Sequence, residues 1–472
     1  MEIIHISAEC YPVAKVGGLA DVVGALPKYQ QQNGDIAKVV IPCYKTRFLF
    51  ENEFELVHQG GIWMGSQWRH FNVIKEKHNK LGFDLYLVDI PGLLDNEQVY
   101  GHHNDPERFL GFQIATLDWI RSWRHRPDVL HCHDHHAALI PFMITQCSSY
   151  ARLEDIPTVL TIHNAQYQGQ FGWDRWQWLP AFDWWKSGLL DWDHAINPLA
   201  SAIKCSWRVT TVSPGYLDEL MFSAAGLESL LQGEKQKCSG ILNGIDTEVW
   251  NPADDEQLPK NYTTRNLAGG KKANKEALCS RFGLNPDLPL VSFIGRLVGE
   301  KGADLLPGII GQADYETDHG ISFLVLGSGD PYVAWQLEEL KTYVRQPNYN
   351  VYIGYDEALS HCIYAGSDFL LMPSRVEPCG LNQLYALRYG TVPVVRMAGG
   401  LKDTVIDFGD EGGYGIRFMH PSVADACHAL RRSVELFQQK SQLGELRRKM
   451  MKLDFSWKKS ARQYADLYSS LK

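Results

Sequence analysis

The chain has 472 residues, a length that predicts two or three domains at about 150 residues per domain. Hydrophobic residues make up 45% of it and charged residues 21%, which is the composition of a globular protein with large cores. The net charge of −9 argues against nucleic acid or an anionic membrane surface as the main partner, although it leaves room for a local basic site that binds phosphate.

Cysteine usage and the N-terminal residues predict a cytoplasmic protein. Ten cysteines are scattered from Cys10 to Cys427 without a C-x-x-C pair, a pattern that favours reduced thiols over a disulfide framework or a metal cluster. The first residues form neither a basic leader nor an apolar run of signal length. No apolar stretch approaches the ~20 residues that span a bilayer.

The first predicted elements are a strand and a helix joined by a glycine-rich turn. Residues 2–7 are β-branched and apolar, which is typical of a buried strand. The stretch AKVGGLADVVGALPK then places Lys15, Gly17 and Gly18 just before a helix whose apolar residues recur at helical spacing. Free N–H groups at a helix start suit an anion, and glycines let a ligand approach the backbone. The alternative is that the glycines serve packing alone.

Strand-like runs then alternate with segments of helix length in both halves of the chain. This alternation predicts parallel sheets with crossover helices, and short continuous apolar runs are expected for strands covered on both faces. We therefore predict two doubly wound α/β domains joined near residue 245. The runs after the first strand are 37–42, 84–90, 128–134, 158–163 and 208–213, followed by 290–295, 322–327, 350–354, 368–373 and 391–396.

The segment HCHDHH, residues 131–136, raises the possibility of a metal site. His131 and His133 would point to the same side of a strand, but no second ligand cluster follows at the spacing of a zinc site. A polar-ligand role for Asp134 and His135 at the strand end is therefore favoured. His163 ends the next strand, where it faces the same cleft as Lys15 or is satisfied within the core.

A tryptophan-rich segment, residues 172–192, holds six of the fourteen tryptophans. Sugar rings often stack on indole faces, so a platform for a sugar is conceivable. The favoured interpretation is an insertion that buries these rings against the first domain, because most tryptophan area is used for packing.

Charged and polar residues follow three strands of the C-terminal half. Arg296 and Lys301 lie in the loop GRLVGEKG, where two cations can neutralise a diphosphate or form a solvated basic turn. Glu377 precedes a helix expected to begin around Gly380, and its carboxylate suits sugar hydroxyls, the alternative being an electrostatic role at the helix start. Tyr355 either stacks on a nucleobase or fills its loop. Ligands of open α/β sheets gather at such strand ends.

In these stretches the sequence resembles the bacterial glycogen synthases and plant starch synthases, which are retaining glycosyltransferases of family five. The resemblance covers nearly the whole chain, and the motifs that carry it occur in the family's order. It rests on KVGGLADVVGALPK, LTIHNAQYQGQF, TTVSPGY, GILNGIDTEVWNP, GRLVGEKG, LGSGDP, SRVEPCGLNQLYALRYGTVPVVR and GGLKDTV.

The resemblance implies a GT-B architecture, with two Rossmann-like domains that face each other across a deep cleft. It implies an acceptor-side domain at residues 1–244, a donor-side domain at 245–454 and a C-terminal helix at 455–472 that returns to the first domain. The implied reaction moves glucose from a nucleotide diphosphate sugar to the non-reducing end of an α-1,4-glucan, with retention of configuration. It implies neither metal nor other cofactor, and neither nucleic acid nor membrane as a partner.

The resemblance also implies roles for individual residues. Lys15, His163, Arg296, Lys301 and Glu377 are implied in catalysis, with the leaving phosphate helping to deprotonate the acceptor hydroxyl. Donor binding is implied for Lys15, Gly17, Gly18, Arg296, Lys301, Tyr355, Glu377, Cys379, Gly380, Leu381 and Asn382. Acceptor or sugar binding is implied for Glu9, Tyr100, Asp134, His163 and Asn164.

The chain departs from the family's pattern in ways that bear on substrate choice. Asn382 stands where the bacterial motif has threonine, and His135 follows Asp134 where tryptophan is usual. ADP-glucose is the expected donor and UDP-glucose the alternative. Rival functions are another retaining hexosyltransferase, a non-catalytic glucan- or nucleotide-binding protein, and a pyridoxal-phosphate phosphorylase of the same architecture.

Overall fold

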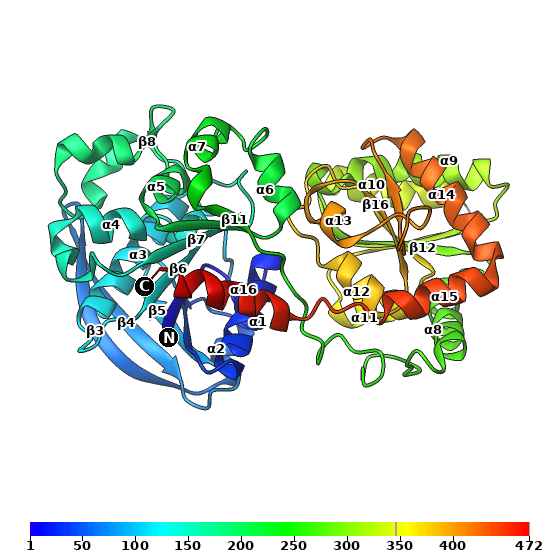
Figure 1. Cartoon of the computed structure of the whole chain (residues 1–472), viewed down its shortest axis with the longest axis horizontal. Helices are drawn as coiled ribbons and strands as arrows, with labels where there is room; N and C mark the ends of the chain where they lie inside the picture. The colour runs from blue at the N-terminus through cyan, green and yellow to red at the C-terminus, as the bar shows by residue number, and fades with distance from the viewer. Residues whose placement is uncertain (345–346, 472) are drawn as a thin grey trace. The chain divides into compact units, whose positions relative to one another are not determined.

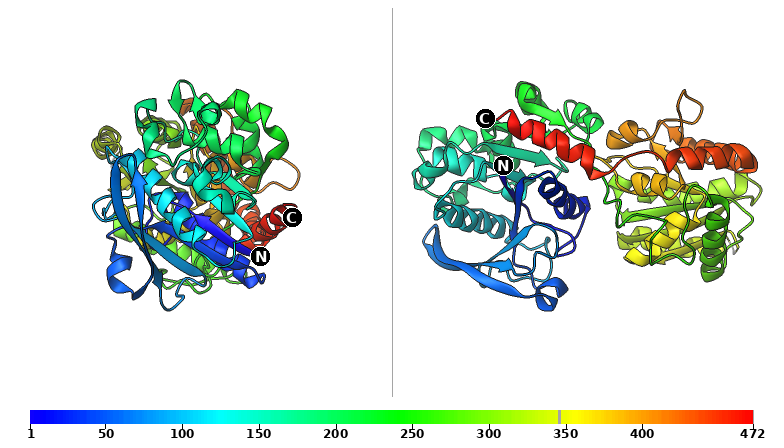
Figure 2. Two further views of the ribbon diagram at one scale, coloured as in Figure 1. Left: turned by 90° about the vertical axis from the view of Figure 1, so that its left-hand side faces the viewer. Right: turned by 60° about the horizontal axis from the view of Figure 1, so that its bottom comes forward.

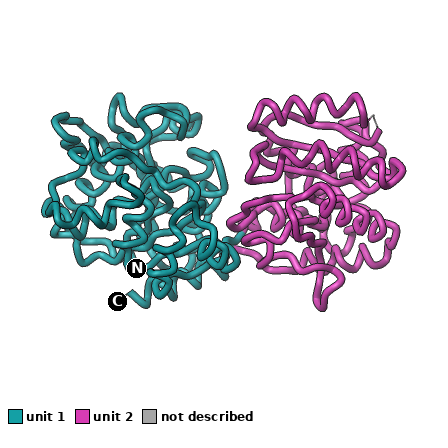
Figure 3. The backbone as a smooth tube through the Cα atoms, turned by 90° about the horizontal axis from the view of Figure 1, so that it is seen from above, with its two compact units in different colours: residues 1–244, 457–472 teal, residues 245–456 magenta. Residues whose placement is uncertain are grey.

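The computed structural model describes residues 1–344 and 347–471. The chain divides into two compact units (Figure 3): unit 1 contains residues 1–244 and the segment from Trp457 on, and unit 2 contains residues 245–456. Unit 2 therefore ends two residues beyond the predicted boundary at 454. Within the described residues, no helix is both long and apolar enough to cross a membrane.

Unit 1 is built on a nine-stranded sheet in the order β11-β10-β7-β6-β1-β2-β5-β4-β3 (Figure 1). The seven strands from β11 to β5 pair in parallel, and β1 lies between β6 and β2. The chain winds from β1 outward through β2 and then resumes on the other side with β6, so a topological switch point lies between β1 and β6. The strands are β1 (Glu2–Ile6), β2 (Ile36–Pro42), β3 (Phe54–Met64), β4 (Gln67–Glu76), β5 (Asp84–Asp89), β6 (Val129–His133), β7 (Thr158–Ile162), β10 (Arg208–Thr211) and β11 (Cys238–Gly240).

Unit 2 is built on a six-stranded, wholly parallel sheet in the order β14-β13-β12-β15-β16-β17. Its switch point lies between β12 and β15, because the chain runs outward from β12 to β14 and resumes with β15. The strands are β12 (Leu290–Leu297), β13 (Ser322–Gly329), β14 (Tyr349–Ile353), β15 (Phe369–Met372), β16 (Val392–Arg396) and β17 (Ile416–Phe418).

Helices cover both faces of the parallel sheets, which makes each unit a Rossmann-like α/β layer structure (Figures 1 and 2). Unit 1 contains α1 (Gly18–Gln32), α2 (Arg47–Glu51), α3 (Asp105–Arg121), α4 (Ile140–Gln146), α5 (Pro198–Cys205), α6 (Pro214–Leu220), α7 (Glu228–Gly233) and α16 (Trp457–Ser469). Unit 2 contains α8 (Leu267–Phe282), α9 (Leu306–Glu316), α10 (Pro331–Glu339), α11 (Glu357–Gly366), α12 (Asn382–Arg388), α13 (Gly399–Thr404), α14 (Val423–Gln438) and α15 (Lys440–Met450).

Each run predicted as a strand is a strand in the structure, so the predicted doubly wound class is confirmed. The antiparallel hairpin of β3 and β4 was not predicted; it pairs with the edge of the first sheet through β4 and β5. The last helix, α16, packs along α1 in unit 1. Trp457, Tyr464 and Tyr468 of α16 join Val22 and Leu26 of α1 in one buried cluster.

Candidate functional site

The candidate residues of each unit follow strands at or near its switch point. In unit 1 they follow β1, β5, β6 and β7, and in unit 2 they follow β12, β14 and β15. Open parallel sheets bind ligands at this edge, because neighbouring loops there part in opposite directions and leave a crevice.

In unit 1 the carboxylate of Glu9 holds the glycine-rich turn in place. Its Oε2 accepts hydrogen bonds from the backbone N–H groups of Val16, at 2.6 Å, and Gly17, at 2.9 Å. Its Oε1 accepts a bond of 2.7 Å from the hydroxyl of Tyr100. Glu9 is buried, so these three bonds compensate its removal from water. The two predicted acceptor-side residues Glu9 and Tyr100 are thus brought together, and Glu9 also fixes the loop that carries Lys15.

Lys15 lies beside the start of α1. Its Nζ is 2.8 Å from Oδ1 of Asp21, in the first turn of that helix, and 4.9 Å from the ring centroid of Tyr11. Its side chain is about one-quarter exposed. An incoming phosphate would share this ammonium group with the carboxylate of Asp21.

Two glycines of this region differ in what surrounds them. A Cβ atom added to Gly24, inside α1, would lie 2.5 Å from the carbonyl oxygen of Tyr11, so packing requires glycine there. A Cβ on Gly17 would meet no atom within 4 Å, and the φ of Gly17, −146°, is open to any residue. Neither packing nor backbone conformation therefore requires glycine at position 17.

Asp134 adopts an unusual backbone conformation directly after β6. Its φ is +54°, a region that non-glycine residues seldom occupy and that is enriched at functional sites. Its Oδ1 accepts hydrogen bonds from the backbone N–H groups of His163, at 2.7 Å, and Asn164, at 3.4 Å. Burial raises the pKa of Asp134 to about 7, against the lowering effect of these two bonds. The structure thus brings together three predicted residues from two neighbouring strands.

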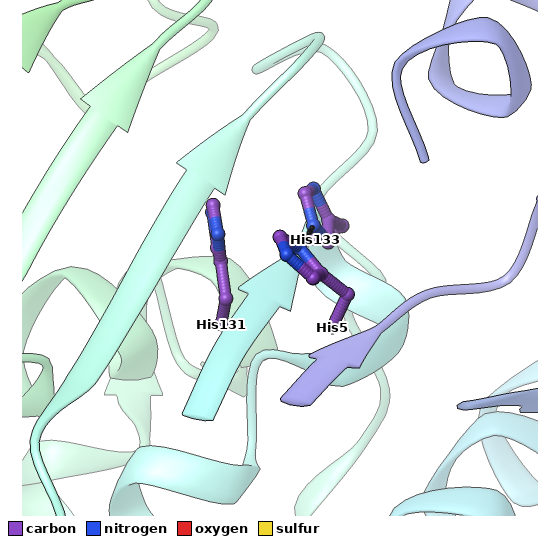
Figure 4. A group of neighbouring side chains, drawn as sticks. All are labelled: His5, His131 and His133. Atoms are coloured by element: carbon purple, nitrogen blue, oxygen red, sulfur yellow. Dashed lines mark hydrogen bonds between the residues drawn. The ribbon is translucent and has the colours of Figure 1, made fainter. Parts of the chain in front are cut away.

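Three buried histidine rings form the one group in the described chain with metal-ligating geometry (Figure 4). His5 of β1 and His131 and His133 of β6 place ligand nitrogens within 4.8 Å of one another. All six of their ring nitrogens already have hydrogen-bond partners, and the rings are fully buried without a carboxylate in the group. A metal ion would break these bonds and bring an uncompensated charge into the core, so the residues do not fit a metal ion.

In unit 2 the loops after β12 and β15 are joined by backbone hydrogen bonds. The carbonyl oxygen of Glu300 accepts bonds from the N–H groups of Arg375, at 2.7 Å, and Val376, at 3.1 Å. Gly302 lies so close to Pro373 that an added Cβ would be 2.3 Å from its carbonyl oxygen. This close approach, together with a φ of +66°, requires glycine at position 302.

These joined loops bring Lys301 and Glu377 into contact. The Nζ of Lys301 is 2.6 Å from Oε1 of Glu377, and the hydroxyl of Ser374 donates a bond of 2.9 Å to Oε2. The Glu377 side chain is 5% exposed, whereas that of Lys301 is 25% exposed. Arg296, at the end of β12, extends a more exposed guanidinium that pairs with Glu300 at 3.2 Å. Two cations, Arg296 and Lys301, and two carboxylates, Glu300 and Glu377, are therefore grouped at the switch point of unit 2.

The helix expected around Gly380 begins two residues later, at Asn382. Gly380 has a φ of +72° and forms the turn before it, followed by Leu381 at the cap position. The Asn382 side chain donates a hydrogen bond of 2.7 Å to the carbonyl oxygen of Ile294 in β12, while Cys379 is buried beside this turn. The helix thus starts two residues later than expected, because Gly380 forms a left-handed turn before it.

Tyr355 has an exposed ring in the loop after β14. It follows β14, is 69% exposed, and its hydroxyl is 3.0 Å from a carboxylate oxygen of Glu357. Sequence reasoning identified this aromatic ring but not its partner.

The tryptophan-rich segment folds as two short 3-10 turns in unit 1, Trp173–Trp178 and Trp184–Leu189. Three of its six indoles are exposed: Trp176, Trp184 and Trp185, the last by 74%. The other three, Trp173, Trp178 and Trp192, are half-buried, so the expectation that the segment buries its rings is wrong for three rings and only partly met for the rest. They pack partly on one another, as with Trp176 and Trp184, whose ring centroids are 5.2 Å apart.

The partners of the charged residues were missed at the sequence level. Asp21, Glu300 and Ser374 each contact a predicted site residue. The spacing of four residues between Arg296 and Glu300 is a weak signal of that pair. No local signal connects Gln30 with Tyr468, because 438 residues separate the two.

Comparisons with known proteins show the family of the chain. Residues 2–233 match the family described as starch synthase catalytic domain, and residues 274–450 match glycosyl transferases group 1. A glycogen synthase of Flavobacterium johnsoniae is 52% identical over 469 residues, covering 99% of each chain. The chain belongs to the glycogen synthase and starch synthase family.

Other members of this family and a more distant fold relative extend the comparison. A glycogen synthase of Geobacillus thermodenitrificans is 35% identical, covering 100% of this chain and 98% of its own. The catalytic domain of starch synthase IV from Arabidopsis thaliana, solved with ADP and acarbose, has a TM-score of 0.91 at 32% identity and covers 100% of this chain and 99% of its own. Sucrose-phosphate synthase from Thermosynechococcus elongatus, at 16% identity and a TM-score of 0.64, shares the GT-B fold. The chain is thus a glycosyltransferase of the glycogen synthase family with the GT-B fold.

Proposed function

We propose that this glycosyltransferase moves glucose from ADP-glucose to the non-reducing end of an α-1,4-glucan, with retention of configuration and without a metal ion or other cofactor. The observation that carries the proposal is the group of Arg296, Lys301 and Glu377 at the switch point of unit 2. A sugar joined to a diphosphate needs this combination of charges in one place.

The bond changes explain why cations and a carboxylate are needed together. The bond between the sugar C1 and the β-phosphate oxygen breaks, and its electron pair goes to the leaving ADP. Arg296 and Lys301 stabilise this negative charge, each preorganised donor being worth roughly 3 kcal/mol, or about a hundredfold in rate. The acceptor hydroxyl oxygen forms the new bond to C1 on the same face, and its proton passes to the leaving phosphate.

Glu377 has a different role in this scheme. Its buried carboxylate keeps Lys301 in position and accepts hydrogen bonds from hydroxyls of the transferred glucose. The anomeric centre develops positive charge as the leaving group departs, and a nearby carboxylate stabilises that charge.

Residues of unit 1 complete the proposed chemistry. Lys15 adds a third positive charge for the diphosphate, and the open space at Gly17 lets the donor approach the backbone. The transferred glucose or the acceptor contacts five further residues of unit 1: Glu9, Tyr100, Asp134, His163 and Asn164. In unit 2, Tyr355 lies beside the base, and the turn from Cys379 to Asn382 lines the nucleotide site.

ADP-glucose is preferred over UDP-glucose because the plant relative with 32% identity over the whole chain was solved with ADP. Asn382 stands where the family's bacterial motif has threonine, so UDP-glucose is kept as the second candidate donor. The amide nitrogen of that side chain already donates to Ile294, so its oxygen is the atom that can accept a bond from a nucleotide.

A donor-competition assay tests the proposal. Purified protein is incubated with glycogen and equal amounts of the two nucleotide sugars, each with a different radiolabel in its glucose. We expect the label of ADP-glucose in the polymer, and its release by an amylase specific for α-1,4 linkages. Preferential incorporation from UDP-glucose would show that UDP-glucose, and not ADP-glucose, is the donor. No incorporation from either nucleotide sugar would refute the proposed function.

A further inference from the structure

A hydrogen-bonded network of buried side chains connects the C-terminal helix α16 with His163 (Figure 4 shows three of its rings). We call it the histidine network. In its first branch, Nε2 of His163 is 3.0 Å from Nδ1 of His133, and Nε2 of His133 is 3.0 Å from Nδ1 of His5. Nε2 of His5 is then 2.7 Å from Oε1 of Gln30 in α1.

The second branch begins at the same glutamine. Nε2 of Gln30 is 3.3 Å from the hydroxyl of Tyr468 in α16, which is 2.7 Å from Nδ1 of His131. Nε2 of His131 is 2.6 Å from the hydroxyl of Thr161, and that oxygen is 2.6 Å from the hydroxyl of Thr210. Thr210 ends the branch on the backbone carbonyl oxygen of Leu160, at 3.3 Å.

The carbonyl oxygen of Leu160 determines which group donates in each hydrogen bond of the second branch, because a carbonyl oxygen can only accept. Thr210 donates to it and therefore accepts from Thr161, which in turn accepts from the Nε2–H of His131. Burial lowers the pKa of His131 well below its usual value, so this ring is neutral and its Nδ1 accepts. The donor to that Nδ1 is the hydroxyl of Tyr468.

The orientation of Gln30 follows from this direction. Since the Tyr468 hydroxyl proton is directed to His131, its oxygen accepts from the amide nitrogen of Gln30. The amide oxygen of Gln30 consequently faces His5 and accepts from its Nε2–H.

The first branch then has one possible direction as well. Burial lowers the pKa of His5 to about 4, and that of His133 well below its usual value, so both rings are neutral at pH 7. His5 donates through Nε2 and accepts through Nδ1, and His133 does the same. Nε2 of His163 must therefore carry a proton, and this ring, with its pKa lowered to about 3, leaves Nδ1 unprotonated.

We propose that the histidine network holds His163 as the Nε2–H tautomer, so that its Nδ1 accepts a hydrogen bond from a hydroxyl of the transferred sugar. The assignment of the sugar as ligand rests on the proposed function, whereas the tautomer rests on the network alone. Gln30, His5, His133 and Tyr468 are positioning residues that act through His163. Gln30 of α1 and Tyr468 of α16 thus determine which ring nitrogen of His163 is free to accept a hydrogen bond from the substrate.

The tautomer is tested directly by neutron diffraction of the perdeuterated protein at pH 7. We expect deuterium on Nε2 of His163, His133, His5 and His131, and none on their Nδ1 atoms. Deuterium on Nδ1 of His163 would overturn the proposal. This result does not depend on activity, so it stays decisive even if neither nucleotide sugar is a substrate.

The positioning role is tested with Tyr468→Phe, which removes the hydroxyl that orients Gln30. The matched control is Tyr464→Phe on the same helix. It removes a buried hydroxyl that is not part of the histidine network. We expect Tyr468→Phe to lower kcat/KM for ADP-glucose about three- to tenfold, the contribution of one hydrogen bond, and Tyr464→Phe to keep the wild-type value. In ¹⁵N NMR spectra, the His163 ring of Tyr468→Phe should show both tautomers.

A purely structural role for Tyr468 is distinguished with donors that lack one hydroxyl. Monodeoxy analogues of ADP-glucose are assayed with the wild type and with Tyr468→Phe. For the analogue without the hydroxyl that contacts His163, the two proteins should have equal rates, because the interaction is already lost. A constant penalty for Tyr468→Phe with every analogue, or wild-type rates together with a single Nε2–H tautomer in that variant, would overturn the positioning role.

Discussion

At the scale of single residues, chemistry-bearing side chains could be identified from the sequence, but their partners could not. Lys15, Lys301 and Glu377 were found because each follows an apolar run that ends as a strand of a parallel sheet. Their contacts with Asp21 and with each other depend on loop conformation and on a spacing of 76 residues, which no local pattern encodes. The left-handed turn at Gly380, with a φ of +72°, was likewise not predicted.

A comparison of two glycines tests whether a ligand explains the first loop. We expect Gly17→Ala to change the free energy of unfolding by less than about 1 kcal/mol, because no atom lies within 4 Å of the added methyl group. Its binding of ADP-glucose should nevertheless weaken at least tenfold, as measured by calorimetry.

Gly24→Ala, inside the helix that Gly17 precedes, is the matched control. Its methyl group would collide with the Tyr11 carbonyl at 2.5 Å, so it should lower stability by about 1–3 kcal/mol. Unchanged ligand binding in Gly17→Ala would show that this glycine does not face the donor.

At the scale of elements, the parallel strands were predictable and the β3–β4 hairpin was not. Parallel strands are buried on both faces, so they appear in the sequence as continuous apolar runs. The hairpin lies at the edge of the sheet, and its exposed residues include Leu56, Val57, Trp63 and Trp68, which obscure the alternation of a half-buried strand. The exposed indoles of the 172–192 segment were misjudged for a related reason, since composition alone does not reveal which rings are covered.

The docking of α16 on unit 1 is tested by removing its largest buried side chain. Trp457 is 2% exposed and packs among residues of β1, α1 and β6. We expect Trp457→Ala to lower the free energy of unfolding by about 3–5 kcal/mol in denaturant titrations. Trp207→Ala, at an indole that is 42% exposed, should change it by less than about 1 kcal/mol. Equal effects of the two variants would contradict the packing described for α16.

At the scale of the whole molecule, the buried histidines dictate how stability responds to acid. Burial lowers the pKa of six histidines of unit 1 that are wholly or mostly buried: His5, His131, His133, His135, His136 and His163. Below their unfolded pKa of about 6.5, the unfolded chain binds more protons than the native protein, so stability falls as pH falls. Asp134 has the opposite sign, because its pKa is raised to about 7 and its contribution decreases as pH rises.

The net effect of these groups is about five protons, or roughly 7 kcal/mol per pH unit once pH is well below 6.5. Since domains are stable by about 5–15 kcal/mol, we expect cooperative unfolding of unit 1 within about two pH units of 6.5. Circular dichroism during acid titration measures it. Asp134→Asn should steepen the pH dependence by removing the opposing titration. Full stability of the native signal at pH 4 would contradict the burial of these rings as neutral groups.

In the proposed reaction, cations of the chain itself stabilise the departing diphosphate. The most direct test is to measure glucosyl transfer from ADP-glucose to glycogen in the presence of a chelator. Arg296 is the residue of choice, because its exposed pair with Glu300 contributes little to stability and its loss should leave the fold intact. We expect the wild type to keep its full rate with chelator present and Arg296→Met to lose about a hundredfold in kcat. A wild-type rate that disappears with the chelator, or an Arg296→Met variant as fast as the wild type, would contradict this proposal.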